Sequence, residues 1–386
     1  MLSVLIIVTS ANKRKSFGLK TYNEQEVGLA KSLSKRGVEC GIAYYGGDVE
    51  REDLVDCGGI KIKMYLFRGF DFLKNVFFKS YDHIYNQYDI LLPITYDHYE
   101  SYHIAMKYPE KTIIYHGTYY SSFNKRYNFK CKVVDPFIIP GYRKKNTTFV
   151  TKNNLAADFL KDKGIFNTKV IGVGFDAEQM AGRERQESEI SNALHTFKKE
   201  GYKILLYVGR IEPRRNTLFL LEVFDKIRKR EKVKLVIIGK GNVEYVEKCR
   251  QLIKAKGLKN DILYVERMEQ RFLPPIYQLA DLFLLPTSYE IFGMVILESM
   301  FFQTPVLTTL NGGSDILIKN GVSGYIVPEL DIDRWADKSL EILNKDNSNL
   351  TSVAHKTITE EFVWDVLADK FIESFNKKLN TKDASK

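Results

Sequence analysis

Two glutamates, Glu290 and Glu298, lie on either side of a Phe-Gly-Met sequence in the stretch SYEIFGMVILES. The stretch follows the apolar run DLFLLP, so a strand pattern gives way to a helix pattern here. Gly293 would let the backbone approach a ligand closely, and Phe292 to Met294 would supply free amides of the first helical turn. The two carboxylates could then reach opposite ends of one extended polar ligand. The same residues also fit a plainer structure, in which Glu290 caps the helix and Glu298 is solvated.

Three arginines follow a second apolar run, KILLYVG, which ends at Gly209. Arg210, Arg214 and Arg215 stand between this strand pattern and the next helix pattern. Guanidinium groups form paired, charge-assisted hydrogen bonds, so several of them at one strand end are suited to a diphosphate.

The elements that would position these residues alternate along the whole chain. Short apolar runs rich in β-branched residues are separated by amphipathic helical patterns, which favours central parallel strands with helices on each side. The runs are SVLIIVTS (3–10), CGIAYYG (40–46), DILLPIT (89–95), TIIYHG (112–117), TTFVT (147–151), KVIGVG (169–174), KILLYVG (203–209), KLVIIG (234–239), DLFLLP (281–286) and PVLTT (305–309). This pattern predicts an α/β protein with two doubly wound domains, residues 1–180 and 181–360, followed by a final helix pattern in 361–386.

Composition indicates a folded chain of 386 residues, because 44% hydrophobic and 27% charged residues are ordinary for a globular protein. The first ten residues do not have the order of a signal peptide, and no apolar segment reaches the length of a membrane helix. The four cysteines form no CxxC pair, and the six histidines do not cluster. We therefore expect a soluble, cytoplasmic protein with no metal ion and no bound cofactor.

Positive charge is concentrated in the first half of the chain. Residues 1–170 contain 26 Lys and Arg against 17 Asp and Glu, a surplus of nine, whereas residues 171–386 contain 32 against 31. The runs FNKRYNFKCK (123–132) and YRKKN (142–146) mix basic residues with aromatic ones. Such a surface could face an anionic membrane or a phosphorylated acceptor, or it could be a solvated face with no partner. No RNP, KH or zinc motif supports nucleic-acid binding.

An ordered series of motifs resembles the retaining GT-B glycosyltransferases, in particular family 4, the glycosyl transferases group 1. The series is GR-x4-R (209–215), LVIIGKGN (235–242), LP-x2-Y-x2-AD (273–281), LPTSYEIFGMVILES (285–299), TPVLTT (304–309), NGG (311–313) and NG-x2-G (320–324). The resemblance implies two Rossmann-like domains that face each other across a cleft. It also implies that the last segment returns to the N-terminal domain around Trp364.

The resemblance assigns roles to individual residues. Glu298 would bind the ribose hydroxyls of a nucleotide, Glu290 and the Phe292–Met294 amides would hold the donor sugar, and Arg210 and Arg215 would neutralise the diphosphate beside Gly209. A lone histidine at a strand end is more often structural, but the alignment with the family favours a role for His116, just past a strand pattern, facing the donor sugar. The remaining assigned positions are Gly18, Lys20 and Thr21 for the phosphates and Arg267 and Met268 for the base.

Several positions depart from the family pattern. Lys20 and Thr21 stand where the family has paired glycines, and Arg215 replaces the usual lysine. Glu266 replaces a frequent glycine before Arg267. A DID triplet at 331–333 resembles the metal-binding DxD of the other large glycosyltransferase fold, but it opens a helix pattern, so we expect Asp333 to be an N-cap.

The implied activity is transfer of a hexose from a nucleoside diphosphate sugar, with UDP favoured, to a hydroxyl, without metal and with retention at the anomeric carbon. The basic N-terminal half favours a lipid-linked or cell-surface glycan precursor as acceptor, as in polysaccharide biosynthesis, and peripheral contact with an anionic membrane. Two alternatives stay open: a catalytically silent partner subunit with the same fold, and a nucleotide-sugar epimerase.

Overall fold

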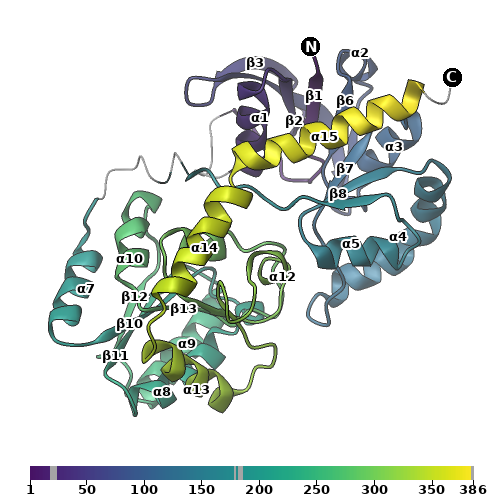
Figure 1. Cartoon of the computed structure of the whole chain (residues 1–386). Helices are drawn as coiled ribbons and strands as arrows, with labels where there is room; N and C mark the ends of the chain where they lie inside the picture. Colours follow the sequence, from purple (N-terminus) through teal and green to yellow (C-terminus); the bar gives the residue numbers. More distant parts are fainter. Residues whose placement is uncertain (18–23, 178–179, 181–185, 384–386) are drawn as a thin grey trace. The chain divides into compact units, whose positions relative to one another are not determined.

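The computed structural model describes residues 1–17, 24–177, 180 and 186–383 (Figure 1). The chain divides into two compact units, each with its own core. Unit 1 comprises Met1–Asp176 together with Phe362–Lys386, and unit 2 comprises Ala177–Glu361. Among the described residues, none of the helices combines the length and the apolar composition needed to cross a bilayer.

Unit 1 contains nine strands and six helices within the described residues. The strands are β1 (Ser3–Ile7), β2 (Glu39–Gly47), β3 (Arg51–Asp56), β4 (Lys61–Phe72), β5 (Asn75–Phe78), β6 (Ile90–Pro93), β7 (Ile113–His116), β8 (Thr148–Thr151) and β9 (Thr168–Val170). The helices are α1 (Gln25–Lys35), α2 (Asp82–Tyr85), α3 (Tyr99–Lys107), α4 (Lys125–Lys144), α5 (Asn154–Lys161) and α15 (Trp364–Asp383).

The sheet of unit 1 has a central parallel part and an antiparallel edge. Its order is β3-β4-β2-β1-β6, and single parallel bridges between Leu91 and Thr112 and between Ile94 and Tyr115 continue it into the sheet β7-β8-β9. All residues of β1 and β6 are buried, as expected for parallel strands covered on both faces. The predicted parallel core is therefore confirmed in this unit.

The antiparallel edge of unit 1 was not predicted. β3 and β5 both pair antiparallel with β4. Residues alternate between exposed and half-buried along β3, and the end of β4 is exposed, so these strands lack the continuous apolar runs that mark a central strand. Exposed antiparallel edge strands therefore cannot be recognised from continuous apolar runs in the sequence.

Trp364 at the start of α15 fills a narrow space inside unit 1. A Cβ atom on Gly28 of α1 would lie 2.2 Å from the indole Nε1, and one on Gly174 would lie 2.2 Å from the indole Cδ2. The backbone reinforces the contact, because the Phe175 amide donates to the Phe362 carbonyl at 2.7 Å. The indole therefore joins the last helix to both α1 and the segment after β9.

Unit 2 is organised around one parallel sheet. Its strands are β10 (Lys203–Val208), β11 (Val233–Ile238), β12 (Ile262–Val265), β13 (Leu282–Leu285), β14 (Val306–Thr308) and β15 (Tyr325–Ile326). Its helices are α7 (Glu189–Lys199), α8 (Thr217–Arg228), α9 (Val243–Ala255), α10 (Leu273–Leu279), α11 (Met294–Phe301), α12 (Ser314–Leu317), α13 (Ile332–Leu343) and α14 (Ser348–Glu361), with short 3₁₀ turns at Pro213–Arg215 and Gln270–Phe272.

The strand order β12-β11-β10-β13-β14-β15 reverses direction between β10 and β13. The chain first adds strands on one side of β10 and then returns to add β13 on the other side. In doubly wound sheets, a ligand site forms outside the carboxyl ends of the two strands at such a switch point. The topology therefore predicts a ligand site at the residues that follow β10 and β13.

The DID triplet is a helix start, but the capping residue differs from the prediction. Asp331 is the N-cap of α13, and its side chain accepts a hydrogen bond from the Arg334 amide at 2.8 Å. Asp333 lies within the first turn. The prediction of Asp333 as N-cap was wrong by two residues, because Ile332 already has helical geometry and the first aspartate takes the cap.

Candidate functional site

The loops after β10 and β13 are joined directly by hydrogen bonds. Asn216 donates from Nδ2 to the Pro286 carbonyl and to Ser288 Oγ, both at 2.7 Å. The Ser288 amide donates to the Arg214 carbonyl at 2.8 Å. Asn216 itself has φ of 53°, a left-handed conformation that asparagine tolerates better than most residues. The two strand ends of the switch point thus form one continuous polar surface.

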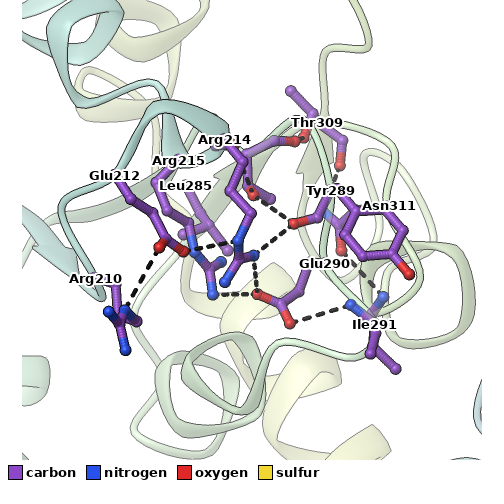
Figure 2. Close-up of polar contacts among 12 residues, drawn as sticks. Arg210, Glu212, Arg214, Arg215, Leu285, Tyr289, Glu290, Ile291, Thr309 and Asn311 are labelled. Carbon is purple, nitrogen blue, oxygen red and sulfur yellow. Dashed lines mark hydrogen bonds and ion pairs between the residues drawn. The ribbon is translucent and has the colours of Figure 1, made fainter. Parts of the chain in front are cut away.

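A cluster of charged side chains covers this surface (Figure 2). Arg215 forms an ion pair with Glu290, and Nη1 of Arg214 lies 3.7 Å from the same carboxylate oxygen. Arg214 also donates to the Tyr289 carbonyl at 2.7 Å and pairs through Nε with Glu212 at 2.7 Å. The ion pairs therefore bring together Arg215 and Glu290, two residues that lie 75 positions apart in the sequence.

The arginines retain donors that could bind an anion. Nε and Nη1 of Arg215 are buried and have no hydrogen-bond partner within the part of the chain that the structure describes. Arg210, whose side chain is 70% exposed, contacts the cluster through Glu212 at 3.5 Å. Buried guanidinium donors without partners are costly, and a bound anion such as a diphosphate would satisfy them.

The loop after β14 fixes the turn between Glu290 and α11. The Gly312 amide donates to the Glu290 carbonyl at 3.0 Å. A Cβ atom on Gly313 would lie only 1.6 Å from the Phe292 carbonyl oxygen, so a glycine is required for this approach. Phe292 and Gly293 are buried, and Met294 is half-buried at the first position of the helix. The amides predicted to hold a ligand thus lie on a turn held by backbone contacts.

Gly293, with φ of 76°, is the N-cap of α11, so the alternative in which Glu290 caps this helix is wrong. The Glu290 carboxylate instead accepts from the Ile291 amide at 3.1 Å and pairs with the arginines. The left-handed conformation at Gly293 favours glycine over other residues.

Glu298 is buried inside the unit, so the alternative of a solvated helix residue is also wrong. Its side chain accepts a hydrogen bond from the Tyr277 hydroxyl at 2.7 Å. Burial raises the pKa of the Glu298 carboxyl to about 8. Tyr277 therefore holds one carboxyl oxygen of a group that is largely protonated at neutral pH, and this positioning role was not predicted.

The other assigned positions are distributed over the same unit, over unit 1 and over undescribed segments. Gly209 follows β10, and Arg267 and Met268 follow β12, so all three lie at the carboxyl edge of the unit 2 sheet. Within the described ranges, these three residues form no hydrogen bond or ion pair with the side chains of the charged cluster. Gly18, Lys20 and Thr21 lie outside the described residues.

His116 ends β7 in unit 1 and is fully buried. Its ring meets Tyr96 edge to face, with centroids 5.0 Å apart, and stacks on Phe159 at 5.7 Å. Burial lowers the pKa of His116 to about 4, although the Asp97 carboxylate acts in the opposite direction. The imidazole is therefore neutral at pH 7, whatever role it has.

Unit 1 is expected to lose stability between pH 6.5 and pH 4. Burial also lowers the pKa of His98 to about 4, whereas both histidines titrate near 6.5 when unfolded. In this window the unfolded state binds more protons than the folded state. The free energy of unfolding therefore decreases as the pH is lowered, by up to about 3 kcal/mol for each histidine. Denaturation at a series of pH values measures the slope, and His98→Gln should flatten it. An unchanged slope in His98→Gln and in His116→Gln would show that other groups control the acid response.

A glutamate and a tyrosine in the site were given no role in the sequence analysis. Glu212 and Tyr277 both stand inside quoted motifs, GR-x4-R and LP-x2-Y-x2-AD. A carboxylate between two arginines in GRIEPRR is a local signal for an ion-pair network, so Glu212 could have been found from the sequence. The Tyr277–Glu298 contact has no local signal, because it depends on how α10 packs against α11.

Comparison with known proteins gives matches to the C-terminal part of the chain. Residues 192–357 match the family model for glycosyl transferases group 1. An uncharacterized glycosyltransferase of Methanocaldococcus jannaschii is 29% identical over 220 residues, covering 55% of each chain. The lipopolysaccharide 1,2-N-acetylglucosaminetransferase of Salmonella typhimurium is 29% identical over 185 residues, 45% of this chain and 48% of that protein. The alignments thus span about half the length of these curated relatives.

A solved structure matches over nearly the full length. The Anabaena protein HepE in complex with UDP and glucose superposes with a TM-score of 0.67, at 14% identity, covering 98% of this chain and all of that chain. At this identity the likeness shows a shared fold, which is GT-B, built from two Rossmann-like units. The region that carries the charged cluster and Glu298 thus lies within residues 192–357, which match the family model for glycosyl transferases group 1.

Proposed function

We propose that the protein is a retaining, metal-independent glycosyltransferase of family 4 that transfers a hexose from a nucleoside diphosphate sugar to a hydroxyl group. The observation that carries the proposal is the arginine cluster at the switch point, where Arg215 has buried donors with no partner among the described residues, beside Glu290. A diphosphate would satisfy these donors, and the sugar attached to it would lie next to the glutamate.

Donor binding would exchange one ion pair for another. Without a ligand, Arg215 pairs with Glu290. A diphosphate would compete for the guanidinium, because it carries more negative charge than one carboxylate, and Glu290 could then accept hydrogen bonds from sugar hydroxyls. Glu298, held by Tyr277, would bind the ribose.

The reaction would be catalysed mainly by electrostatic stabilisation of the leaving group. Cleavage of the bond between sugar and diphosphate concentrates negative charge on the diphosphate, where Arg210, Arg215 and the amides of the Phe292–Met294 turn would stabilise it. The acceptor hydroxyl would attack from the face that the leaving group departs, and the diphosphate would take its proton. Glu290 and His116 would position the sugar without forming a covalent intermediate.

UDP-sugars are the favoured donors, and a lipid-linked or cell-surface glycan precursor is the favoured acceptor. A structural neighbour binds UDP and glucose, and one relative acts on lipopolysaccharide. The surplus of nine basic residues in residues 1–170 would suit an anionic acceptor or peripheral contact with an anionic membrane.

The test measures nucleoside diphosphate release from UDP-, GDP- and ADP-sugars in EDTA, with Glu298→Ala alongside. Wild-type protein should turn over one class of donor, and the variant should bind that donor at least tenfold more weakly, because two ribose hydrogen bonds are lost. Glu247→Ala, which removes an exposed glutamate of α9, is the matched control and should behave as wild type.

Two other outcomes would reject the proposal. If no donor were bound or turned over, the protein would act as a silent partner of another enzyme. An isomerised donor without any acceptor would identify an epimerase.

A further inference from the structure

Helix α4 of unit 1 presents an apolar stripe to the solvent. Phe129, Val133 and Phe137 are 69%, 50% and 77% exposed, and Pro136 and Pro140 are exposed beside them. At about 100° per residue, these five positions share one face of the helix. The opposite face packs into the unit through Cys131, Ile138, Ile139 and Tyr142, all of which are buried. The stripe is thus additional to the face that the fold needs.

Basic side chains border the stripe on both sides and at both ends of α4. The exposed ones are Lys125, Arg126, Lys132, Arg143, Lys144 and, just after the helix, Lys145. The only acidic residue of α4, Asp135, accepts a hydrogen bond from the Tyr96 hydroxyl at 2.7 Å and pairs with Lys163. The exposed face is therefore apolar and positive, with no carboxylate to offset its charge.

More positive charge lies at the C-terminal end of α4. A cavity of about 810 Å³ opens there, and its lining includes Lys144 and Lys145. The other lysines around it come from β9 and α15, namely Lys169, Lys377 and Lys378, against the two acidic residues Glu110 and Glu373. Lys169 pairs with Glu373 at 2.7 Å, so the cavity keeps a net positive charge.

We propose that the exposed face of α4 binds an anionic lipid surface, with Phe129 and Phe137 inserted among the headgroups and the basic residues paired with lipid phosphates. Charge complementarity is the reason for choosing this occupant, because a helix with a bare aromatic stripe between cations matches the interface of an anionic bilayer. A second copy of the chain would bring the same positive charge to the contact and would be repelled. Such a contact would give the protein access to a lipid-linked acceptor, and this purpose rests on the proposed function.

The first test is flotation with vesicles of phosphatidylcholine, with and without about 30 mol % phosphatidylglycerol. The wild-type protein should bind the anionic vesicles, bind phosphatidylcholine alone about tenfold more weakly, and dissociate as salt is raised. The double variant Phe129→Ser with Phe137→Ser should lose about tenfold in affinity for the anionic vesicles. Donor hydrolysis by this variant should equal that of the wild type, so the result is independent of whether the proposed reaction is correct.

The matched control removes two exposed phenylalanines elsewhere in unit 1. Phe70 and Phe72 of β4 are each 63% exposed, and Phe70→Ser with Phe72→Ser should leave vesicle binding unchanged. If the α4 double variant failed to fold, Arg126→Gln with Lys132→Gln should still lower binding to anionic vesicles. Equal binding to neutral vesicles, or an equal loss in both phenylalanine pairs, would overturn the proposal. So would a dimer that the α4 variant dissociates, since the stripe would then bind a second copy.

Discussion

Arg215→Ala is expected to lower kcat for donor turnover by about 10² to 10³-fold, which is the usual effect of removing one donor that stabilises a developing anion. The guanidinium is buried, pairs with Glu290, and keeps two donors that no other residue in the described part of the chain satisfies. Its removal would leave the leaving diphosphate with less positive charge and would also release the Glu290 carboxylate. Initial rates of nucleoside diphosphate release at saturating donor measure the effect.

Arg215→Lys separates charge from geometry at the same position. A lysine keeps the charge but cannot form paired hydrogen bonds, so a rate between those of the wild type and the alanine variant is expected. Arg250→Ala, which removes an exposed arginine of α9, is the control for general loss of positive charge. Wild-type turnover by Arg215→Ala would refute the assignment of this cluster to the diphosphate, and the same holds for Arg210→Ala.

Trp364→Ala is expected to destabilise unit 1 by about 3 to 5 kcal/mol, the range for truncating a large buried aromatic residue. The indole is 3% exposed and lies against the backbones of Gly28 and Gly174, which have no side chains to fill the cavity left behind. Urea denaturation followed by circular dichroism measures the loss as a lower midpoint for the first of two transitions.

The second tryptophan provides the control for this experiment. Trp335 of α13 is fully buried in unit 2, so its fluorescence reports the unfolding of that unit. The Trp335 transition should stay at its wild-type midpoint in Trp364→Ala. A Gly174→Ala variant should also destabilise unit 1, by about 1 to 3 kcal/mol, because its Cβ would overlap the indole. If Trp364→Ala unfolded at the wild-type midpoint, the indole would not be needed to hold α15.

Most of the strands predicted from the sequence are buried on both faces. The half-buried β9 was also predicted, and β4, whose centre is buried, was missed. β10, β11 and β13 are continuous apolar runs because helices cover both faces of the sheet in a doubly wound fold. β12 is only half-buried along its length, and β3 alternates at an antiparallel edge, so neither has such a run. For most strands, recognition from the sequence therefore depended on burial, which is decided by neighbours distant in sequence.

The site was predictable as a set of residues but not as a set of contacts. Arg215 and Glu290 were each assigned a role, yet their ion pair follows from the adjacency of β10 and β13, which a linear pattern does not specify. For the same reason, local spacing left Glu298 open between a ligand-binding and a solvated position. Its burial against Tyr277 depends on the packing of α10 and α11.

The division of unit 1 into two chain segments has a consequence for the order of folding during synthesis. Residues 1–176 leave the ribosome long before Phe362 and Trp364, whereas all of unit 2 is made in one continuous stretch. Domains generally fold as units as they emerge. Unit 2 can therefore complete its fold first, while the nascent N-terminal segment still exposes the groove between Gly28 and Gly174 that the indole later fills. Until α15 is translated, that groove is an apolar surface that chaperones could recognise, and a ribosome stalled before residue 362 would leave it uncovered.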